Sequence, residues 1–333
     1  MNNKKTVSLL ILMLLLAIFL ALRAGRYEIG YAQIFEYLKA AILSERTGDE
    51  QIYAVITQIR LPRIAFAVLV GAALSAAGAV YQGLFKNPLV SPDILGVSSG
   101  AAVGASIAII LSLPVLYVSL MAFGFGLAAV FAVVFLSQLI AINVIIMVLS
   151  GVVISSLFGA FSSLLKFLAD SENKLPEITF WLMGSLARTG EYQNVLYMLG
   201  VTAFCSVPLF LLRFRLNILA FGEEEAKAMG VNVKFYSFII ICASTLLTAS
   251  SVAFCGIIGW VGLIVPHIAR SIVGSNFNAL LPASMLIGAL FLLVVDTIAR
   301  CAMASETPLG IITSLIGAPV FIYLLYQSKK GWL

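Results

Sequence analysis

Charged residues are scarce in this sequence. Of its 333 residues, only 11% are Asp, Glu, Lys or Arg, while 62% are hydrophobic. Soluble proteins carry roughly twice that charged fraction, and a water-soluble fold with this composition would expose large apolar patches. The apolar runs are also continuous, without the alternation typical of a membrane β-barrel. Because backbone groups inside a bilayer must be hydrogen-bonded within the structure, we predict an all-α polytopic membrane protein.

Cysteine and histidine are scarce too. The four cysteines, Cys205, Cys242, Cys255 and Cys301, show no Cys-x-x-Cys spacing, so we interpret them as small core residues and not as zinc ligands or disulfides. His267 is the single histidine and lacks the partners of a ligand or relay site, which favours a structural, hydrogen-bonded role. Phosphate-binding loops, nucleophile elbows and zinc-protease motifs are missing. We therefore expect no catalytic residue, metal site or cofactor in this chain.

The charges that are present give a net charge of +5, without a basic run interleaved with aromatic residues. Such a run is typical of nucleic-acid binding, so we expect no nucleic-acid partner. Lys166, Arg270 and Asp296 lie near predicted helix ends, where they can reach water. A proton-coupled carrier usually places a titratable residue in mid-helix. The near-absence of such residues argues against a self-sufficient secondary transporter or channel, which is the alternative class of function.

Hydrophobic windows of membrane-spanning length recur along the whole chain, which predicts about ten transmembrane helices in a single transmembrane domain, residues 1–333. The windows are 6–23, 62–82, 97–113, 115–137, 142–168, 192–212, 235–254, 257–272, 279–298 and 308–327. We interpret the first window as a span and not a signal peptide, because Arg23 and Arg26 interrupt any cleavage site. Lysines near both ends of the chain favour cytoplasmic termini.

Two patterns of spacing predict local structure. Ile34, Leu38 and Ile42 form an apolar stripe, which predicts a short amphipathic helix that either lies on the bilayer surface or packs as a loop helix. Small residues recur every four positions on two spans, which predicts close approach of helix backbones in a tight bundle. These residues are Gly71, Ser75, Ala79 and Gly83 on one span, and Gly96, Gly100 and Gly104 on the other.

The segment 214–234 separates two membrane-length windows and contains the stretch FGEEEAKAMGVNV. Three glutamates would occupy a first helical turn, where acidic residues complement the helix dipole. A final glycine is suited to ending the helix. From these residues alone, the stretch is either a compact helix that fits a cleft of another protein or an ordinary loop helix. The residues assigned to it are Gly222, Glu223, Glu224, Glu225, Ala226, Met229 and Gly230.

Glu225-Ala226 followed by Gly230 resembles a shortened coupling-helix motif of permease subunits in ABC importers. The chain also resembles the FecCD-type permease family, which imports iron-siderophores, haem and cobalamin, over nearly its whole length. The stretches that carry the resemblance are RLPRIAFAVLVGAALSAAGAVYQGLFKNPLVSPDILGVSSGAAVGA (60–105), LPEITFWLMGSL (175–186), GWVGLIVPHIARSIVG (259–274) and ETPLGIITSLIGAPVFIYLL (306–325).

The resemblance implies a non-enzymatic permease subunit in a prokaryotic cytoplasmic (inner) membrane, surrounded by lipid. Its implied partners are a second permease copy in a homodimer, or a related permease, together with two cytoplasmic ATPase subunits that bind ATP and Mg²⁺. An extracytoplasmic binding protein delivers the substrate. Both termini and 214–234 would then be cytoplasmic, while 24–61, 170–190 and the region of Arg300 would lie outside. The implied cargo is an iron-siderophore or similar metal chelate, with haem, cobalamin or an oxyanion as alternatives.

The resemblance also implies two sets of site residues. Arg60, Arg63 and Arg300 would receive acidic residues on the two lobes of the binding protein, because guanidinium groups bind carboxylates with two hydrogen bonds. The alternatives are snorkelling to headgroups for Arg60 and Arg63, and an intrahelical pair with Asp296 for Arg300. The translocation path would lie on the two-fold axis, lined by the spans at 62–82 and 142–168. Its candidate lining and gate residues are Ser75, Gln82, Asn143, Ser155 and Ser156.

Overall fold

The computed structural model describes the chain except residues 1–2, 44–48, 141–143, 188–190, 304 and 329–333. The described residues form helices and no strand, as predicted. The helices are α1 (Asn3–Arg23), α2 (Tyr31–Leu43), α3 (Glu50–Ala54), the π-helix η1 (Val55–Arg60), α4 (Leu61–Leu84), the 3₁₀-helix η2 (Pro92–Leu95), α5 (Val97–Ile110), α6 (Val115–Ile140), α7 (Val144–Leu168), α8 (Lys174–Leu182), α9 (Tyr192–Leu211), α10 (Arg213–Leu219), α11 (Glu223–Ala228), α12 (Val233–Cys255), α13 (Val261–Val273), α14 (Phe277–Cys301) and α15 (Leu309–Ser328).

Within the described residues, 7 helices are long and apolar enough to cross a membrane, and three shorter apolar helices, α5, α13 and α15, accompany them. Together they account for the windows predicted from hydropathy. The largest difference is at the second window, where α3, η1 and α4 form one helical run of 35 residues, Glu50–Leu84. Pro62 has no N–H for the carbonyl four residues earlier, and the run passes through the wider π turn just before it.

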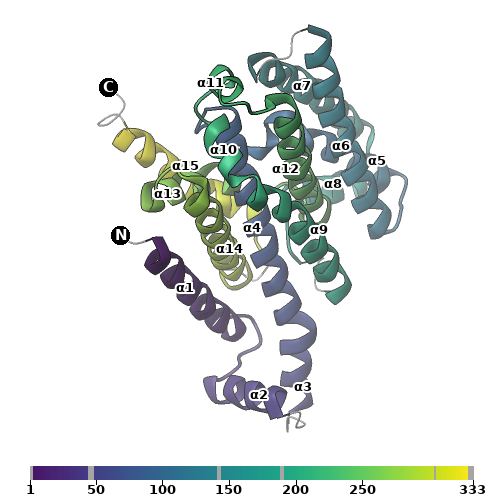
Figure 1. Cartoon of the computed structure of the whole chain (residues 1–333). Coiled ribbons are helices and arrows are strands. Elements are labelled where there is room, and N and C mark those ends of the chain that lie inside the picture. The colour runs from purple at the N-terminus through teal and green to yellow at the C-terminus, as the bar shows by residue number, and fades with distance from the viewer. Residues whose placement is uncertain (1–2, 44–48, 141–143, 188–190, 304, 329–333) are drawn as a thin grey trace.

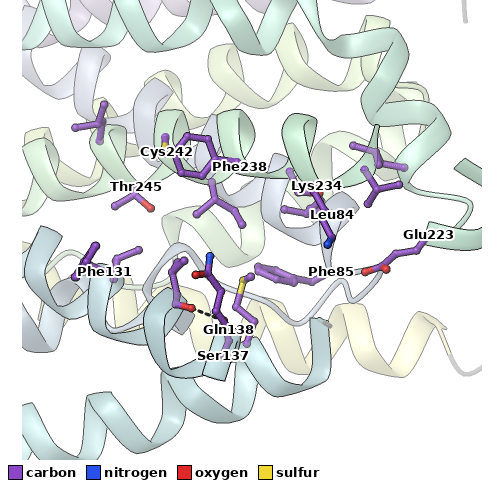
Figure 2. A pocket seen from close by; sticks show the side chains of 18 of the residues that line it. Leu84, Phe85, Phe131, Ser137, Gln138, Glu223, Lys234, Phe238, Cys242 and Thr245 are labelled. Atoms are coloured by element: carbon purple, nitrogen blue, oxygen red, sulfur yellow. Dashed lines mark hydrogen bonds between the residues drawn. The ribbon is translucent and has the colours of Figure 1, made fainter. Parts of the chain in front are cut away.

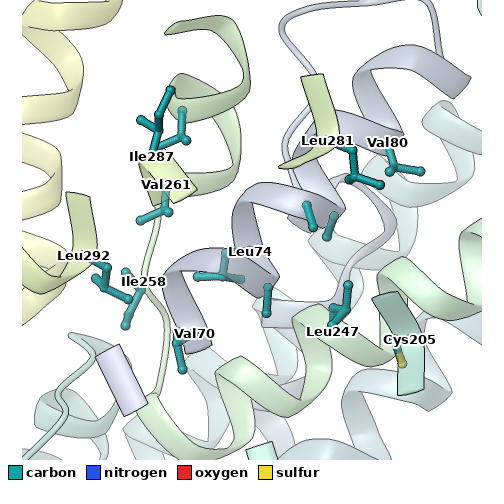
Figure 3. Close-up of a cluster of buried hydrophobic side chains, with 14 of the residues drawn as sticks. Val70, Leu74, Val80, Cys205, Leu247, Ile258, Val261, Leu281, Ile287 and Leu292 are labelled. Atoms are coloured by element: carbon teal, nitrogen blue, oxygen red, sulfur yellow. The ribbon is translucent and has the colours of Figure 1, made fainter. Parts of the chain in front are cut away.

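Helix α4 is the central element of the bundle, and it packs against α9, α12, α13 and α14. Figure 3 shows Leu74 and Val80 of α4 among side chains from these neighbours. The helices approach closely because small residues face each other. A Cβ on Gly71 would lie 2.2 Å from the carbonyl oxygen of Gly288, and one on Gly78 would lie 1.8 Å from that of Gly262. The predicted backbone contact is therefore confirmed for the stripe that contains Gly71.

The second stripe of small residues joins α5 to α6. A Cβ on Gly100 would lie 2.4 Å from the carbonyl oxygen of Phe125, and one on Gly104 would lie 2.3 Å from that of Met121. Any side chain at these two positions would force the helices apart. The stripe therefore packs a helix pair, as its spacing predicted.

Helix α2 confirms the predicted short helix after the first span. Ile34 is fully buried, and Tyr37 and Ala40 are buried on the same face, while the rings of Phe35 and Tyr31 contact Phe19 of α1. This face packs on the protein, which supports the loop-helix alternative. Helices α2 and α3 lie at one end of the molecule, and α11 lies at the opposite end (Figure 1).

The cysteines follow the sequence prediction only in part. Cys205 and Cys255 are buried in the core and Cys242 is half-buried, but Cys301 is exposed. Cys301 is the last residue of α14, where the helix ends and fewer neighbours surround the side chain.

Candidate functional site

The predicted helix in FGEEEAKAMGVNV is present as α11, with Gly222 at its N-cap and the three glutamates in its first turn. Gly230 has a φ of +73° and ends the helix in a Schellman motif. Its N–H donates to the carbonyl of Lys227 (2.9 Å), and the N–H of Val231 donates to that of Ala226 (2.9 Å). The glycine is required here because other residues rarely adopt a positive φ.

Helix α11 has one buried side and one exposed side, and the buried side contains a residue expected on the surface for a partner protein. Ala226 is fully buried and belongs to the hydrophobic core with Val231, so the expectation that it forms part of an outward-facing surface is wrong. The physical reason is that a helix of 6 residues is too short to be stable alone, and Ala226 anchors it. The exposed residues of the segment are Phe221, Glu224, Glu225, Lys227, Ala228, Met229, Gly230 and Asn232.

Two polar contacts tie this region to the long helices. The Lys86 ammonium group, just beyond α4, donates to the carbonyl of Phe221 at 2.6 Å. On the other side, the Asn217 amide of α10 donates to Asn276 (3.1 Å) and accepts from the N–H of Phe277 (2.8 Å), at the start of α14. Sequence reasoning missed Lys86 and Asn217, although a polar residue directly beyond a span is a usable signal. These bonds connect the region of α10 and α11 to the ends of α4 and α14.

The second group of candidate residues lies at the end of the molecule that contains α3. Arg63 makes an ion pair with Asp296 (2.8 Å between Nη2 and Oδ1) and another with Glu306 (2.9 Å between Nη1 and Oε2). Arg300 makes the predicted intrahelical pair with Asp296 (3.2 Å). The expectation that Asp296 reaches water is wrong, because its side chain is fully buried. Two guanidinium groups compensate this buried carboxylate.

Arg60 extends the group toward α1. Its guanidinium donates to the backbone carbonyls of Leu22, Arg23 and Tyr27, and the residue is buried. Snorkelling is therefore excluded for Arg60 and Arg63, because protein groups and not lipid headgroups surround them. Each side chain of the Arg63–Asp296–Arg300 cluster is at most 8% exposed. A docking role for the three arginines stays a prediction. It requires the arginines to exchange these internal bonds for bonds to carboxylates of the binding protein.

The candidate path residues do not lie together. Ser75 is fully buried and donates to the carbonyl of Gly71 at 2.7 Å. Gln82 is buried, donates to the carbonyl of Leu263 (3.0 Å) and accepts from Arg270 (3.2 Å). Both therefore pack inside the chain and cannot line a path between two copies. The reason is that α4 is the core helix, with 83% of its apolar window buried. Asn143 lies outside the described residues.

Helix α7 is mostly exposed, in contrast to the buried helix α4, because only 17% of its apolar window is buried. Ser155 faces α5, with its hydroxyl oxygen 3.1 Å from the Cβ position of Gly96, whereas Ser156 is exposed. Ser163, seven residues later, is also exposed, and both hydroxyls donate to backbone carbonyls of their own helix. Ser163 was missed, although the spacing of seven residues on one helical face would have indicated it.

His267 does not have the hydrogen bond that its structural interpretation implied. Its Nδ1 atom is buried and has no hydrogen-bond partner among the described residues. The charged side chain near it on α13, Arg270, is bonded to Gln82.

Groups of three or more His, Cys, Asp or Glu side chains that could hold a metal ion are missing from the described part of the chain.

Comparisons with known proteins agree over nearly the full length. The model of the FecCD transport family matches residues 13–327. The molybdate import system permease protein MolB of Haemophilus influenzae is 44% identical, and the match covers 97% of this chain and 95% of that protein. The hemin transport system permease protein HmuU of Yersinia pestis is 35% identical, with 98% of each chain covered.

A solved inward-facing structure described as a metal-chelate type ABC transporter superposes on this chain with a TM-score of 0.85. The two are 39% identical, and the match covers 98% of this chain and 99% of the other. The apolar helices, the full-length family match and this shared fold identify a multi-pass protein of the inner membrane. The chain belongs to the FecCD transport family and is a permease subunit of an ABC importer.

Proposed function

We propose that this chain and a second copy form the translocation path of an importer, that cytoplasmic ATPase subunits dock on α11, and that an extracytoplasmic binding protein docks at the opposite end. The observation that carries the proposal is α11 itself. It is a short helix between two membrane-length helices, anchored by Ala226, with an exposed outer face and a hydrogen bond from Lys86 to the preceding loop.

This arrangement is suited to transmitting force. ATP and Mg²⁺ are bound by the ATPase and not by this chain, so the chain needs only a surface that moves with its partner. The end of α4 is bonded to the loop before α11 through Lys86, and α10 is bonded to the start of α14. Movement of α11 in the cytoplasm therefore reaches the arginine cluster at the other ends of α4 and α14.

The path is supported by the exposed face of α7. Ser156 and Ser163 lie one above the other on that face, with their hydroxyls bonded to their own helix. Such a surface offers no strong ligand for cargo, which suits a path that passes substrate without a tight site. In the proposed dimer the two-fold axis runs beside α7, so that this face meets its own copy.

For the cargo, we propose a metal chelate of the iron-siderophore class, delivered by the binding protein. The 39% identical structure described as a metal-chelate type transporter supports this class. An oxyanion is the second candidate, because a relative 44% identical over nearly the whole chain is a molybdate permease. Haem is represented among the relatives as well.

Transport by the purified protein in vesicles tests the proposal. Uptake of a ferric siderophore should require ATP on the α11 side and the binding protein on the other side, and should continue when the proton gradient is collapsed. His267→Gln, which cannot carry a proton at neutral pH, should retain most of the uptake. Parallel assays with molybdate decide between the two cargo classes. Uptake driven by a pH gradient without the ATPase would refute the proposal.

A further inference from the structure

An apolar cavity of about 630 Å³ lies between α6 and α12, beside the end of α4 and next to α11. This volume falls within the range of small-molecule sites in proteins. Its walls are mostly aliphatic and aromatic, with Leu84, Val134, Phe238, Ile241 and Leu246 among them, and they also carry the polar side chains of Ser137, Gln138 and Ser237. The cavity adjoins the coupling segment through Glu223 and Lys227, and it is separate from the arginine cluster and from Ser156 and Ser163 on the exposed face of α7.

The two ends of the cavity differ in polarity. Figure 2 shows Lys234 and Glu223 at one end, and Phe131 and Thr245 at the other. The Thr245 hydroxyl is hydrogen-bonded to that of Tyr81 at 2.8 Å, so this end offers no free polar group from Thr245. The cavity is therefore amphiphilic along its length.

The polar end carries one uncompensated positive charge. Glu223 and Lys227, which both line the cavity, are paired with each other at 3.8 Å. Lys234 is exposed and makes no ion pair with any other described residue. The matching ligand has an anionic head and an apolar body.

The length of the cavity fits one leaflet of a bilayer. Lys234 and Thr245 are eleven residues apart on α12, or about 16 Å at the rise of an α-helix. Half of the hydrocarbon thickness of a membrane is about 15 Å. Both walls, α6 and α12, are helices of membrane length, so the length of the cavity matches the distance from a membrane surface to the middle of the bilayer.

We propose that this cavity binds one anionic phospholipid, with its phosphate at Lys234 and an acyl chain between α6 and α12. The assignment of the cavity to the cytoplasmic leaflet rests on the proposed function of α11, which places that helix in the cytoplasm. Anionic lipids are concentrated in that leaflet and attract basic residues at the surface. The bound lipid braces α11 against α6, because Glu223 and Lys227 of α11 line the mouth of the cavity.

Native mass spectrometry of the full-length permease in detergent tests the site, with phosphatidylglycerol and phosphatidylcholine that carry the same acyl chains. Phosphatidylglycerol should bind preferentially, and Lys234→Glu should weaken its binding at least about fivefold, the effect of losing one lysine at an anionic surface. Lys5→Glu, an exposed lysine on α1, is the matched control and should bind like the wild type. Equal binding of both lipids, or an unchanged Lys234→Glu variant, would overturn the proposal.

The wild-type protein provides a second test that no folding defect can confound. Cys242 lines the cavity and is half-buried, whereas Cys301 is exposed on α14. Phosphatidylglycerol should slow maleimide labelling of Cys242 and leave labelling of Cys301 unchanged, as read from peptide masses. If phosphatidylglycerol does not change the rate of Cys242 labelling, occupation of the cavity is refuted. Neither experiment includes an ATPase or a cargo, so a negative result here is distinct from a failure of transport.

Discussion

At the scale of single residues, the arginine cluster shows how this chain can keep charge inside a membrane-spanning bundle. Asp296 is fully buried, with Arg63 and Arg300 on either side of it. Glu306 also pairs with Arg63, but its side chain is 34% exposed. The two carboxylates therefore differ in what their removal should cost, because water can replace the partner only at Glu306.

We predict that Asp296→Asn destabilises the protein by about 3–5 kcal/mol, the usual effect of removing one partner from a buried ion pair. Glu306→Gln should cost only about 0–1 kcal/mol, as for an exposed pair. The unfolding temperature of the detergent-solubilised protein measures both, with Glu306→Gln as the matched control. Equal unfolding temperatures for the two variants would show that Asp296 is not the centre of the cluster.

At the scale of the element, α11 is a helix of 6 residues with one buried side and one exposed side. Ala226 and Ala228 are two residues apart, and only Ala226 is buried. The same substitution at the two positions therefore separates folding of the segment from docking of the ATPase.

We expect Ala228→Arg to abolish co-purification with the ATPase while the permease keeps its wild-type elution and stability, because the arginine projects from the docking face. Ala226→Arg should destabilise the protein, because it places a charge in the core. Ala32→Arg, at an exposed position on α2 at the opposite end, should bind the ATPase normally. An Ala228→Arg variant that still binds the ATPase would place the docking surface elsewhere.

At the scale of the whole molecule, the exposed apolar surface of α7 needs either lipid or a second chain to cover it. Ile145, Val153 and Phe167 are each more than half exposed. The central helix α4 is enclosed by its own chain. Of the two spans assigned to the path from sequence, only α7 can therefore form it at a contact between copies.

We predict that Ser156→Cys, in a variant without the four native cysteines, forms a disulfide-linked dimer on mild oxidation, because residues near a two-fold axis meet their own copy. Phe204→Cys is the control, since Phe204 is 75% exposed on α9 and lies outside the proposed contact. Gel electrophoresis without reductant measures the product. A monomeric Ser156→Cys protein, or equal dimer formation at Phe204, would argue against a path along α7.

The sequence by itself determined the features that depend on composition and on neighbours along the chain. Long apolar runs require helices, because a bilayer offers no partner for backbone groups. The spacing of Gly100 and Gly104 indicated a close helix contact, and Glu223 and Gly230 marked the start and end of a short helix. Each of these depends on residues within a few turns, so one-dimensional reasoning is sufficient.

Only the tertiary structure decided which side of each helix is covered. Ser75 and Ser156 look alike in sequence, yet Ser75 is buried against α14 and Ser156 is exposed. Asp296 and Arg63 are 233 residues apart along the chain, and nothing local indicates their ion pair. In an apolar span, the polar contrast that marks a buried face in soluble helices is missing, because lipid and protein interior are equally apolar. Apart from the two spans with stripes of small residues, the orientation of the spans was therefore decided by their packing partners.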